Sequence, residues 1–270
     1  MLIDKELFDK FFKEDNKNNF INIDIDTFDL FNELLATGEI KNNRHKTFAF
    51  AYYCLVSYLW KYSKYSEQEI NTQDLKRLML IIPTEKRFDY LIKKGGVLDS
   101  AGLTETTKSF PINTTFNELN QIEVTTLDMI EKDMAKAWLQ QYGKRYTCKK
   151  PLLQYDRIDK VGLMYSKDDV LSLSMFEITR ILLCHELGFD GLFVYAYLKY
   201  RNKMLGGQGV TMYYTELENQ IGYKKRRIRE LINNLVSVKL VEVEAEYSHE
   251  ENKVSRKNTY RIISPLNQGN

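Results

Sequence analysis

The stretch YKKRRIRELINNLVSVKLVEVEAEY, residues 223–247, changes its hydrophobic period part-way along. In its first part Ile228, Leu231, Ile232 and Leu235 recur at the spacing of one helix face. From residue 240 onward apolar and acidic residues alternate, which is typical of a half-buried strand. The stretch therefore predicts an amphipathic helix that runs almost directly into a β-strand.

Signals on both sides of this stretch complete a compact unit. TMYYTELENQIG, residues 211–222, predicts a short helix that Thr215 caps and Gly222 ends. After the turn SHEEN, NKVSRKNTYRII at residues 252–263 predicts the partner strand of a hairpin. Over about 75 residues, this order of helix, tight turn, basic helix and hairpin resembles the winged helix-turn-helix superfamily. Lys239 stands where that family commonly has a glycine before the wing.

The resemblance implies that the helix at residues 223–236 enters the major groove of duplex DNA. Because the apolar stripe must face the core, we expect Lys225, Arg226, Arg229 and Asn233 on the exposed side. Arginine binds O6 and N7 of guanine, and asparagine binds adenine in the same two-point manner. Four consecutive cations at residues 224–227 oppose the helix dipole, which favours an external polyanion. The alternative is a charged face that contacts only solvent.

In the hairpin, acidic residues at positions 242, 244 and 246 disfavour phosphate contact along the first strand. We therefore expect only the tip and the second strand of the hairpin to approach DNA. The expected DNA contacts of the whole unit are Tyr223, Lys224, Lys225, Arg226, Arg227, Arg229, Asn233, Lys253, Arg256 and Lys257.

The first half of the chain repeats this pattern. Residues 47–65, 70–81 (capped by Thr72) and 83–96 predict three helices, and residues 96–103 and 108–116 predict two short strands around a polar turn. In the third of these helices Lys86, Arg87 and Lys93 are the candidate DNA contacts, with Asp89 among them. Two interpretations stay open: a second DNA-binding unit, or a degenerate unit that contacts protein.

The remaining segments predict the connections. Residues 2–12 predict a helix, residues 19–28 a strand, and residues 27–38 a helix capped by Thr27. Residues 118–143 predict a long amphipathic helix that either packs on a neighbouring domain or forms a homodimer through residues 118–142. Residues 144–160, centred on Pro151, predict a linker, and residues 174–188 and 189–205 predict two further helices.

The fold class expected from these elements is mainly α with small β-wings: two winged-helix domains joined by a long helix and linker. The expected divisions are an N-terminal winged-helix-like domain at residues 1–117, a connecting helix and linker at 118–160, and a C-terminal DNA-binding domain at 161–270.

Composition excludes several classes of protein. The chain has 270 residues, 39 Lys+Arg and 37 Asp+Glu, so its formal net charge is +2. The three cysteines form no CxxC motif, which excludes a disulfide scaffold and a Cys-rich zinc module. No apolar run reaches the roughly 18 residues of a membrane span, and the charged N-terminus is no signal peptide. We expect a soluble, cytoplasmic protein with no membrane association.

The sequence contains no complete catalytic motif. Only three histidines occur; CHELG at residues 184–188 lacks the second histidine of a zinc protease, and GGQG at 206–209 lacks the ending of a phosphate-binding loop. We therefore expect no enzyme, no metal and no cofactor. Positive charge is instead local, since residues 199–239 contain nine basic and three acidic residues.

The functional expectation is sequence-specific binding of double-stranded DNA, as a transcriptional regulator of a mobile element such as a plasmid or phage. Two winged helices in one chain also resemble theta-type plasmid replication initiators, and the first unit is similar to phage replisome organisers, so binding of origin repeats in DNA replication is the alternative. A third hypothesis, from another class, is a protein-interaction module that uses winged helices as docking surfaces.

Overall fold

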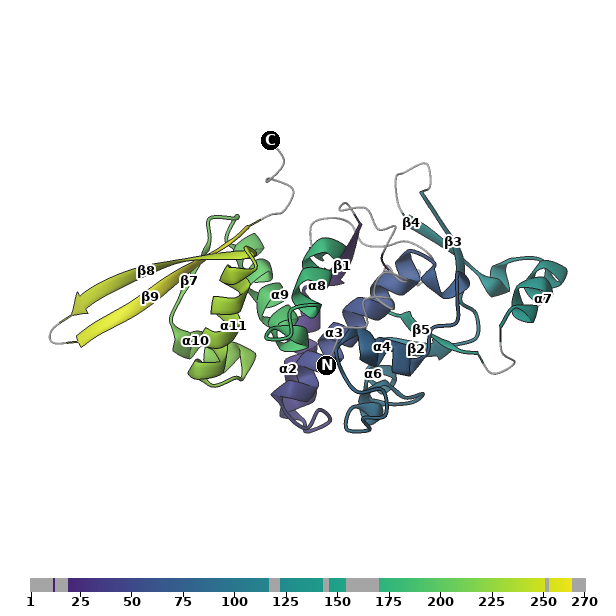
Figure 1. Cartoon of the computed structure of the whole chain (residues 1–270), viewed down its shortest axis with the longest axis horizontal. Helices are drawn as coiled ribbons and strands as arrows, with labels where there is room; N and C mark the ends of the chain where they lie inside the picture. Colours follow the sequence, from purple (N-terminus) through teal and green to yellow (C-terminus); the bar gives the residue numbers. More distant parts are fainter. Residues whose placement is uncertain are drawn as a thin grey trace.

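The computed structural model describes Phe12 and residues 19–116, 122–142, 146–153, 170–250 and 253–263, without the side chains of residues 116, 246–250 and 253–256. These residues form a mixed α/β fold with small sheets. Figure 1 shows an elongated molecule, with hairpin β8–β9 projecting from one end and α7 lying at the other. The predicted helix at residues 2–12 lies outside the described residues, apart from Phe12.

The elements, in chain order, are β1 (Phe20–Asp24), α2 (Asp26–Ala36), α3 (Asn43–Lys61), η1 (Lys64–Ser66), α4 (Thr72–Leu78), α5 (Asp89–Ile92), α6 (Val97–Ser100), β2 (Thr104–Thr107), β3 (Pro111–Phe116), β4 (Ile122–Thr126), η2 (Leu127–Met129), α7 (Lys132–Gln140), β5 (Cys148–Pro151), β6 (Val170–Ser174), α8 (Met175–Leu182), α9 (Gly188–Met204), β7 (Val210–Met212), α10 (Tyr214–Ile221), α11 (Lys225–Ser237), β8 (Val241–Glu250) and β9 (Lys253–Ile262), where η marks a 3-10 helix.

Helices α3 and α9 pack against each other in the middle of the molecule (Figure 1). Nearly every residue of α3 is buried, as expected for a helix that is apolar on all sides. Aromatic rings join the two helices, since Phe50 and Phe193 meet edge to face at 5.2 Å between ring centroids. One hydrophobic core thus contains residues of both halves of the chain.

A two-stranded sheet also connects the two halves. Strand β1 pairs antiparallel with β6, and Ile21 lies opposite Leu173 in that register. Both side chains are fully buried. The strand expected at residues 19–28 is confirmed only over Phe20–Asp24, and its partner comes from the second half. The halves are therefore joined by shared packing and pairing, and not by a helix and linker alone.

The C-terminal unit follows the sequence pattern closely. Helix α10 ends at Gly222, whose φ of +88° is the left-handed conformation that glycine adopts most easily. Helix α11 and hairpin β8–β9 follow, and β9 pairs with both β7 and β8. Lys239 has a φ of +55°, which is the conformation that a glycine there would favour. The predicted cap at Thr215 is wrong, because the helix starts one residue earlier and the Glu216 carboxylate accepts from the backbone N–H of Tyr213.

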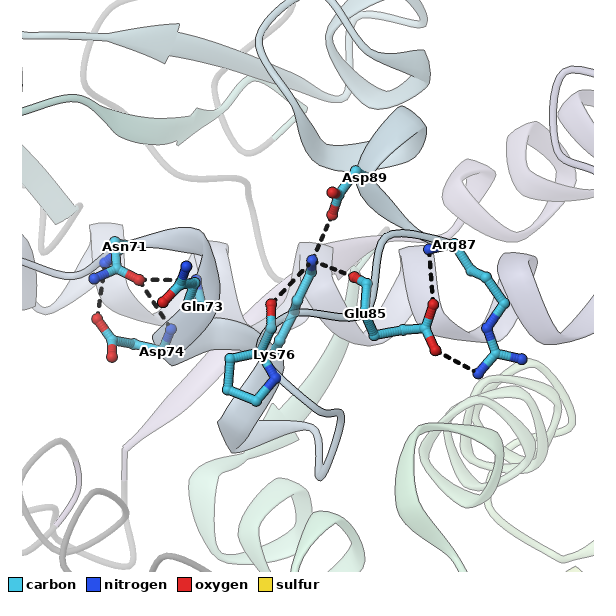
Figure 2. Close-up of polar contacts among 8 residues, drawn as sticks. Asn71, Gln73, Asp74, Lys76, Glu85, Arg87 and Asp89 are labelled. Atoms are coloured by element: carbon cyan, nitrogen blue, oxygen red, sulfur yellow. Dashed lines mark hydrogen bonds and ion pairs between the residues drawn. The ribbon is translucent and has the colours of Figure 1, made fainter.

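The first half departs from the expected repeat at residues 83–96. Only Asp89–Ile92 are helical within that range, and residues 97–100 form α6 where a strand was expected. Figure 2 shows the cause: the Lys76 ammonium lies 2.5 Å from the carbonyl oxygen of Glu85 and is also bonded to the Asp89 carboxylate. Lys76 is only 3% exposed, so its charge requires these acceptors. A continuous helix would have used that carbonyl in its own hydrogen bonds.

Strand pairing in this half also differs from the expected hairpin. Strand β2 pairs with β5, and β3 pairs with β4. Three predictions are therefore wrong: the pair of strands at 96–103 and 108–116 around a turn, whose turn residues form β2; the linker at residues 144–160 in its described part; and the long helix at 118–143. In place of that long helix lie strand β4, the 3-10 helix η2 and the short helix α7. The register Thr104 to Pro151 shows that the central residue of the expected linker belongs to a sheet.

Other local predictions have mixed outcomes. The helices at 27–38, 47–65 and 189–205 are confirmed as α2, α3 and α9, and the helix at 174–188 is confirmed only over Met175–Leu182. Asn71, not Thr72, caps α4 through a reciprocal bond with Asp74 (Figure 2). Thr27 lies inside α2 and does not cap it. Among the described helices, none combines the length and the apolar character that a membrane crossing needs.

Candidate nucleic-acid interface

Helix α11 separates an apolar face from a polar one. Ile228, Leu231, Ile232 and Leu235 are fully buried, which fixes the rotation of the helix on the core. The opposite face exposes a row of four predicted contacts: Lys225, Arg226, Arg229 and Asn233. A helix with one face fixed by packing holds such a row in a constant orientation.

Tyrosines of the preceding segment lie under three of the basic side chains. Lys225 Nζ and Arg229 Cζ lie 5.8 and 5.7 Å from the ring centroid of Tyr214, which is 8% exposed. Lys257 Nζ lies 5.2 Å from the ring centroid of Tyr213. A cation over an aromatic ring is attracted to it without losing its charge, so the three cations stay available to an anion. Sequence reasoning missed both tyrosines, although two adjacent aromatic residues at a helix start were a visible signal.

Arg226 has an acidic neighbour on its own helix. Its Nε lies 3.1 Å from a carboxylate oxygen of Glu230, and its side chain is 93% exposed. An exposed ion pair of this kind contributes little to stability and exchanges readily with other partners. Arg226 can therefore turn from Glu230 to an external anion at low cost.

Tyr223 and Arg227 were expected to face DNA, but the structure turns both toward the protein. The Tyr223 hydroxyl donates to Asp190 Oδ1 at 2.5 Å, and Arg227 lies 3.1 Å from Asp190 Oδ2. Thr47 of α3 also donates to Asp190, at 2.7 Å. Burial, together with the Asp190 charge, raises the pKa of the Tyr223 phenol far above its ordinary value. We assign both residues to anchoring the start of α11, because their polar atoms already have partners inside the protein.

This anchor spans both halves of the chain, since Asp190 lies in α9, Thr47 in α3 and Tyr223 just before α11. Asn43 adds a second link, because its side-chain amide donates to the carbonyl oxygen of Gly222. The start of α11 is thus held by polar groups that lie far away in sequence. No local pattern around residues 223–227 indicated these partners.

The hairpin offers fewer placed contacts than expected. Lys257 is exposed, whereas the side chains of Lys253 and Arg256 lie outside the described residues. Their backbone belongs to β9, opposite Glu250 and Tyr247 of β8. Farther along the hairpin, Arg261 pairs with Glu244 at 2.7 Å. This pair occupies one cation of the second strand near the base of the hairpin, so the contacts expected on that strand are the ones nearer its tip.

In the first half, Lys86, Arg87 and Lys93 do not share a helix. Lys86 and Arg87 lie in the turn before α5, and Lys93 follows its last residue. The Arg87 guanidinium forms an ion pair with Glu85 at 2.8 Å (Figure 2). The helix predicted at residues 83–96, which would have held all three on one element, is therefore wrong. Lys93 lies instead beside a cavity of about 110 Å³ between α4 and the β2–β5 sheet.

Comparison of the chain with protein-family models, curated proteins and solved structures finds no match. Within the described residues, no group of three or more His, Cys, Asp or Glu side chains is placed to hold a metal ion. The functional interpretation of the α11 surface therefore depends on its geometry and charge.

Proposed function

We propose that this protein binds double-stranded DNA in a sequence-specific manner by inserting α11 into the major groove, without an enzymatic step. One observation supports this above all: the exposed row Lys225, Arg226, Arg229 and Asn233 lies on a helix whose opposite face is fully buried. These side chains are long or amide-bearing, so they can reach base edges and phosphates. No acidic residue occurs in the first turn of α11 to offset their charge.

The order of elements around α11 supports a winged-helix interpretation. Helices α9, α10 and α11 precede a hairpin whose second strand also pairs with β7. In the first half, α3, α4 and the short helices α5 and α6 precede β2 and β5 in the same order, with residues 108–147 between the two strands. We propose that both units are winged helices and that only the second has a recognition helix.

The proposed biological role is regulation of transcription in a mobile element. Binding of origin repeats uses the same protein surface, so the bound sequences distinguish the two roles. Selection of bound fragments from the source genome should return promoter-proximal sites for a regulator, and repeated sites at an origin for an initiator. Failure to enrich any sequence over random duplex would refute sequence-specific binding.

The site itself is tested by replacing Lys225, Arg226 and Arg229 with Ala together. We expect duplex affinity to fall by several kcal/mol, since base contacts contribute about 1–3 kcal/mol each. The control replaces three exposed lysines elsewhere, Lys108, Lys132 and Lys136, and removes the same charge. A folded triple variant that binds like the wild type would show that α11 is not the recognition helix.

Asn233 provides a test of base recognition that is separate from charge. Asn233→Ala removes a neutral side chain, so binding to random duplex should stay nearly unchanged. Preference at one base pair of the selected sequence should relax, which competition binding against single-base variants measures. Equal losses on selected and random DNA would count against a base contact.

A further inference from the structure

The start of α3 has exposed positive charge that no carboxylate offsets in the described part of the chain. Lys41 and Arg44 are both exposed, and none of the ion pairs found among the described residues includes either of them. Their neighbours are aromatic rings: Lys41 Nζ lies 4.8 Å from the ring centroid of Tyr90, and Arg44 Cζ lies 5.6 Å from that of Phe189. The first turn of α3 contains no acidic residue. Cations in this position oppose the helix dipole and raise the free energy of the isolated protein.

The pKa of His45 responds to these nearby positive charges. Its ring is 8% exposed, and Nδ1 lies 2.8 Å from the Tyr90 hydroxyl. Burial lowers the pKa of His45, and the charges of Lys41, Arg87 and Arg44 lower it further. Three cations from two segments of the first half therefore act on one buried histidine, and Lys41 does so from above the Tyr90 ring whose hydroxyl contacts it. Arg87 shares its charge with Glu85, while Lys41 and Arg44 have no carboxylate partner within the part of the chain that the structure describes.

This cluster of Lys41, Arg44 and Arg87, which we call the α3 basic patch, adjoins the start of α11. Asn43 lies between Lys41 and Arg44 in sequence, and its amide donates to the carbonyl oxygen of Gly222. Gly222 precedes Lys224 by two residues. The segment that carries Lys41 and Arg44 thus contacts the segment just before α11, although about 180 residues separate the two in sequence.

We infer that the α3 basic patch binds the sugar–phosphate backbone of the same duplex that α11 enters. This inference rests on the proposed function and adds a second contact surface to it. Phosphate contacts position a protein on DNA without distinguishing sequence, and they need only cations that can reach the backbone beside the groove. The first half of the chain then contacts DNA through the start of α3 and the turn at Arg87, and needs no recognition helix of its own. Both halves meet a single segment of duplex.

Lys41→Ala combined with Arg44→Ala tests the inference. We expect affinity for selected and for random duplex to fall by the same factor, because phosphate contacts are independent of sequence. The slope of log K against log salt concentration should fall in magnitude by about 1.8, since each lost phosphate contact contributes about 0.9. Both side chains are exposed, so the variant should fold, which circular dichroism and thermal melting check. Lys132→Ala with Lys136→Ala in α7, at the far end of the molecule, is the control of equal charge and should leave the slope unchanged.

The outcomes separate this inference from the proposed function. A wild type that binds duplex, with a patch variant that keeps the wild-type salt slope, overturns the inference and leaves α11 as the binding surface. A patch variant that loses binding only to the selected sequence also overturns it, because that result indicates base contact. A wild type that binds no duplex even at low salt overturns the proposed function itself.

Discussion

Replacing Asp190 should loosen the attachment of α11 to the rest of the protein. Asp190→Ala removes one acceptor from three donors: the hydroxyls of Thr47 and Tyr223, and the guanidinium of Arg227. The two hydroxyls lie 3.0 Å apart, and Thr47 also lies 3.1 Å from the carbonyl oxygen of Arg44, so Tyr223 can donate to Thr47 and Thr47 to that carbonyl. Both hydroxyls then keep an acceptor, but they exchange a charged acceptor for neutral ones. A hydrogen bond to a charged group contributes about 1.5–3 kcal/mol, and a neutral one about 0.5–1.5 kcal/mol. Arg227 is 38% exposed and keeps Glu230 within 3.7 Å, so loss of its ion pair with Asp190 adds only about 0–1 kcal/mol.

We therefore expect the free energy of unfolding to fall by roughly 1–4 kcal/mol. Urea unfolding followed by circular dichroism measures this value, and the change should appear in the midpoint with little change in the slope. Asp190→Asn keeps one acceptor oxygen and should lose less. Asp133→Ala removes an ion-paired carboxylate that is 94% exposed, and should change stability by less than about 0.5 kcal/mol. If Asp190→Ala and Asp133→Ala prove equally stable, the anchor has no energetic role.

Two further predictions concern the junction between the halves. Gly222→Ala should destabilise the fold by at least about 1 kcal/mol, because φ is +88° and the added methyl would overlap the Asn43 side chain. Adding Asn43→Ala removes the overlap but not the backbone strain, so it should restore only part of the lost stability in the same urea assay. Full recovery would argue against backbone strain. His45 favours its neutral form in the folded state, so its contribution to stability should be lost as pH falls below about 6.5. Replacing Lys41 and Arg44 with Ala together should raise the pKa of His45 in an NMR titration and reduce that loss. An unchanged His45 pKa would place these two cations too far from the ring.

The C-terminal unit was predictable because its signals are local. The apolar spacing at residues 228–235 and the glycine at 222 each determine one feature within a few residues. The exposed row on α11 follows from the buried stripe by geometry alone. What failed there were Tyr223 and Arg227, which lie at the edge of that exposed arc. Their partner Asp190 belongs to another helix, so only the folded structure brings them together.

The first half was less predictable because its structure depends on distant partners. Residues 83–88 have a helical pattern, but the buried Lys76 ammonium binds their carbonyl oxygens, and nothing in the sequence marks that lysine as buried. Strand β2 pairs with β5, some 40 residues farther along the chain. A hairpin prediction pairs each strand with the next one in sequence, so it misses a partner at that distance. Residues 118–143 contain apolar positions at helical spacing, yet their first part pairs with β3 as a strand. A β-partner that satisfies backbone groups overrides this spacing.

The pairing of β1 with β6 has a consequence for synthesis of the chain. Asn22 and Ser172 hydrogen bond across 150 residues, so the first strand has no partner until the second half leaves the ribosome. At about 5–20 residues per second, that interval lasts roughly 8–30 s. Throughout it, the apolar surface of α3 that later packs on α9 is exposed to solvent or to chaperones. The shared core therefore closes late, and a fragment cut before residue 170 lacks the strand that completes it.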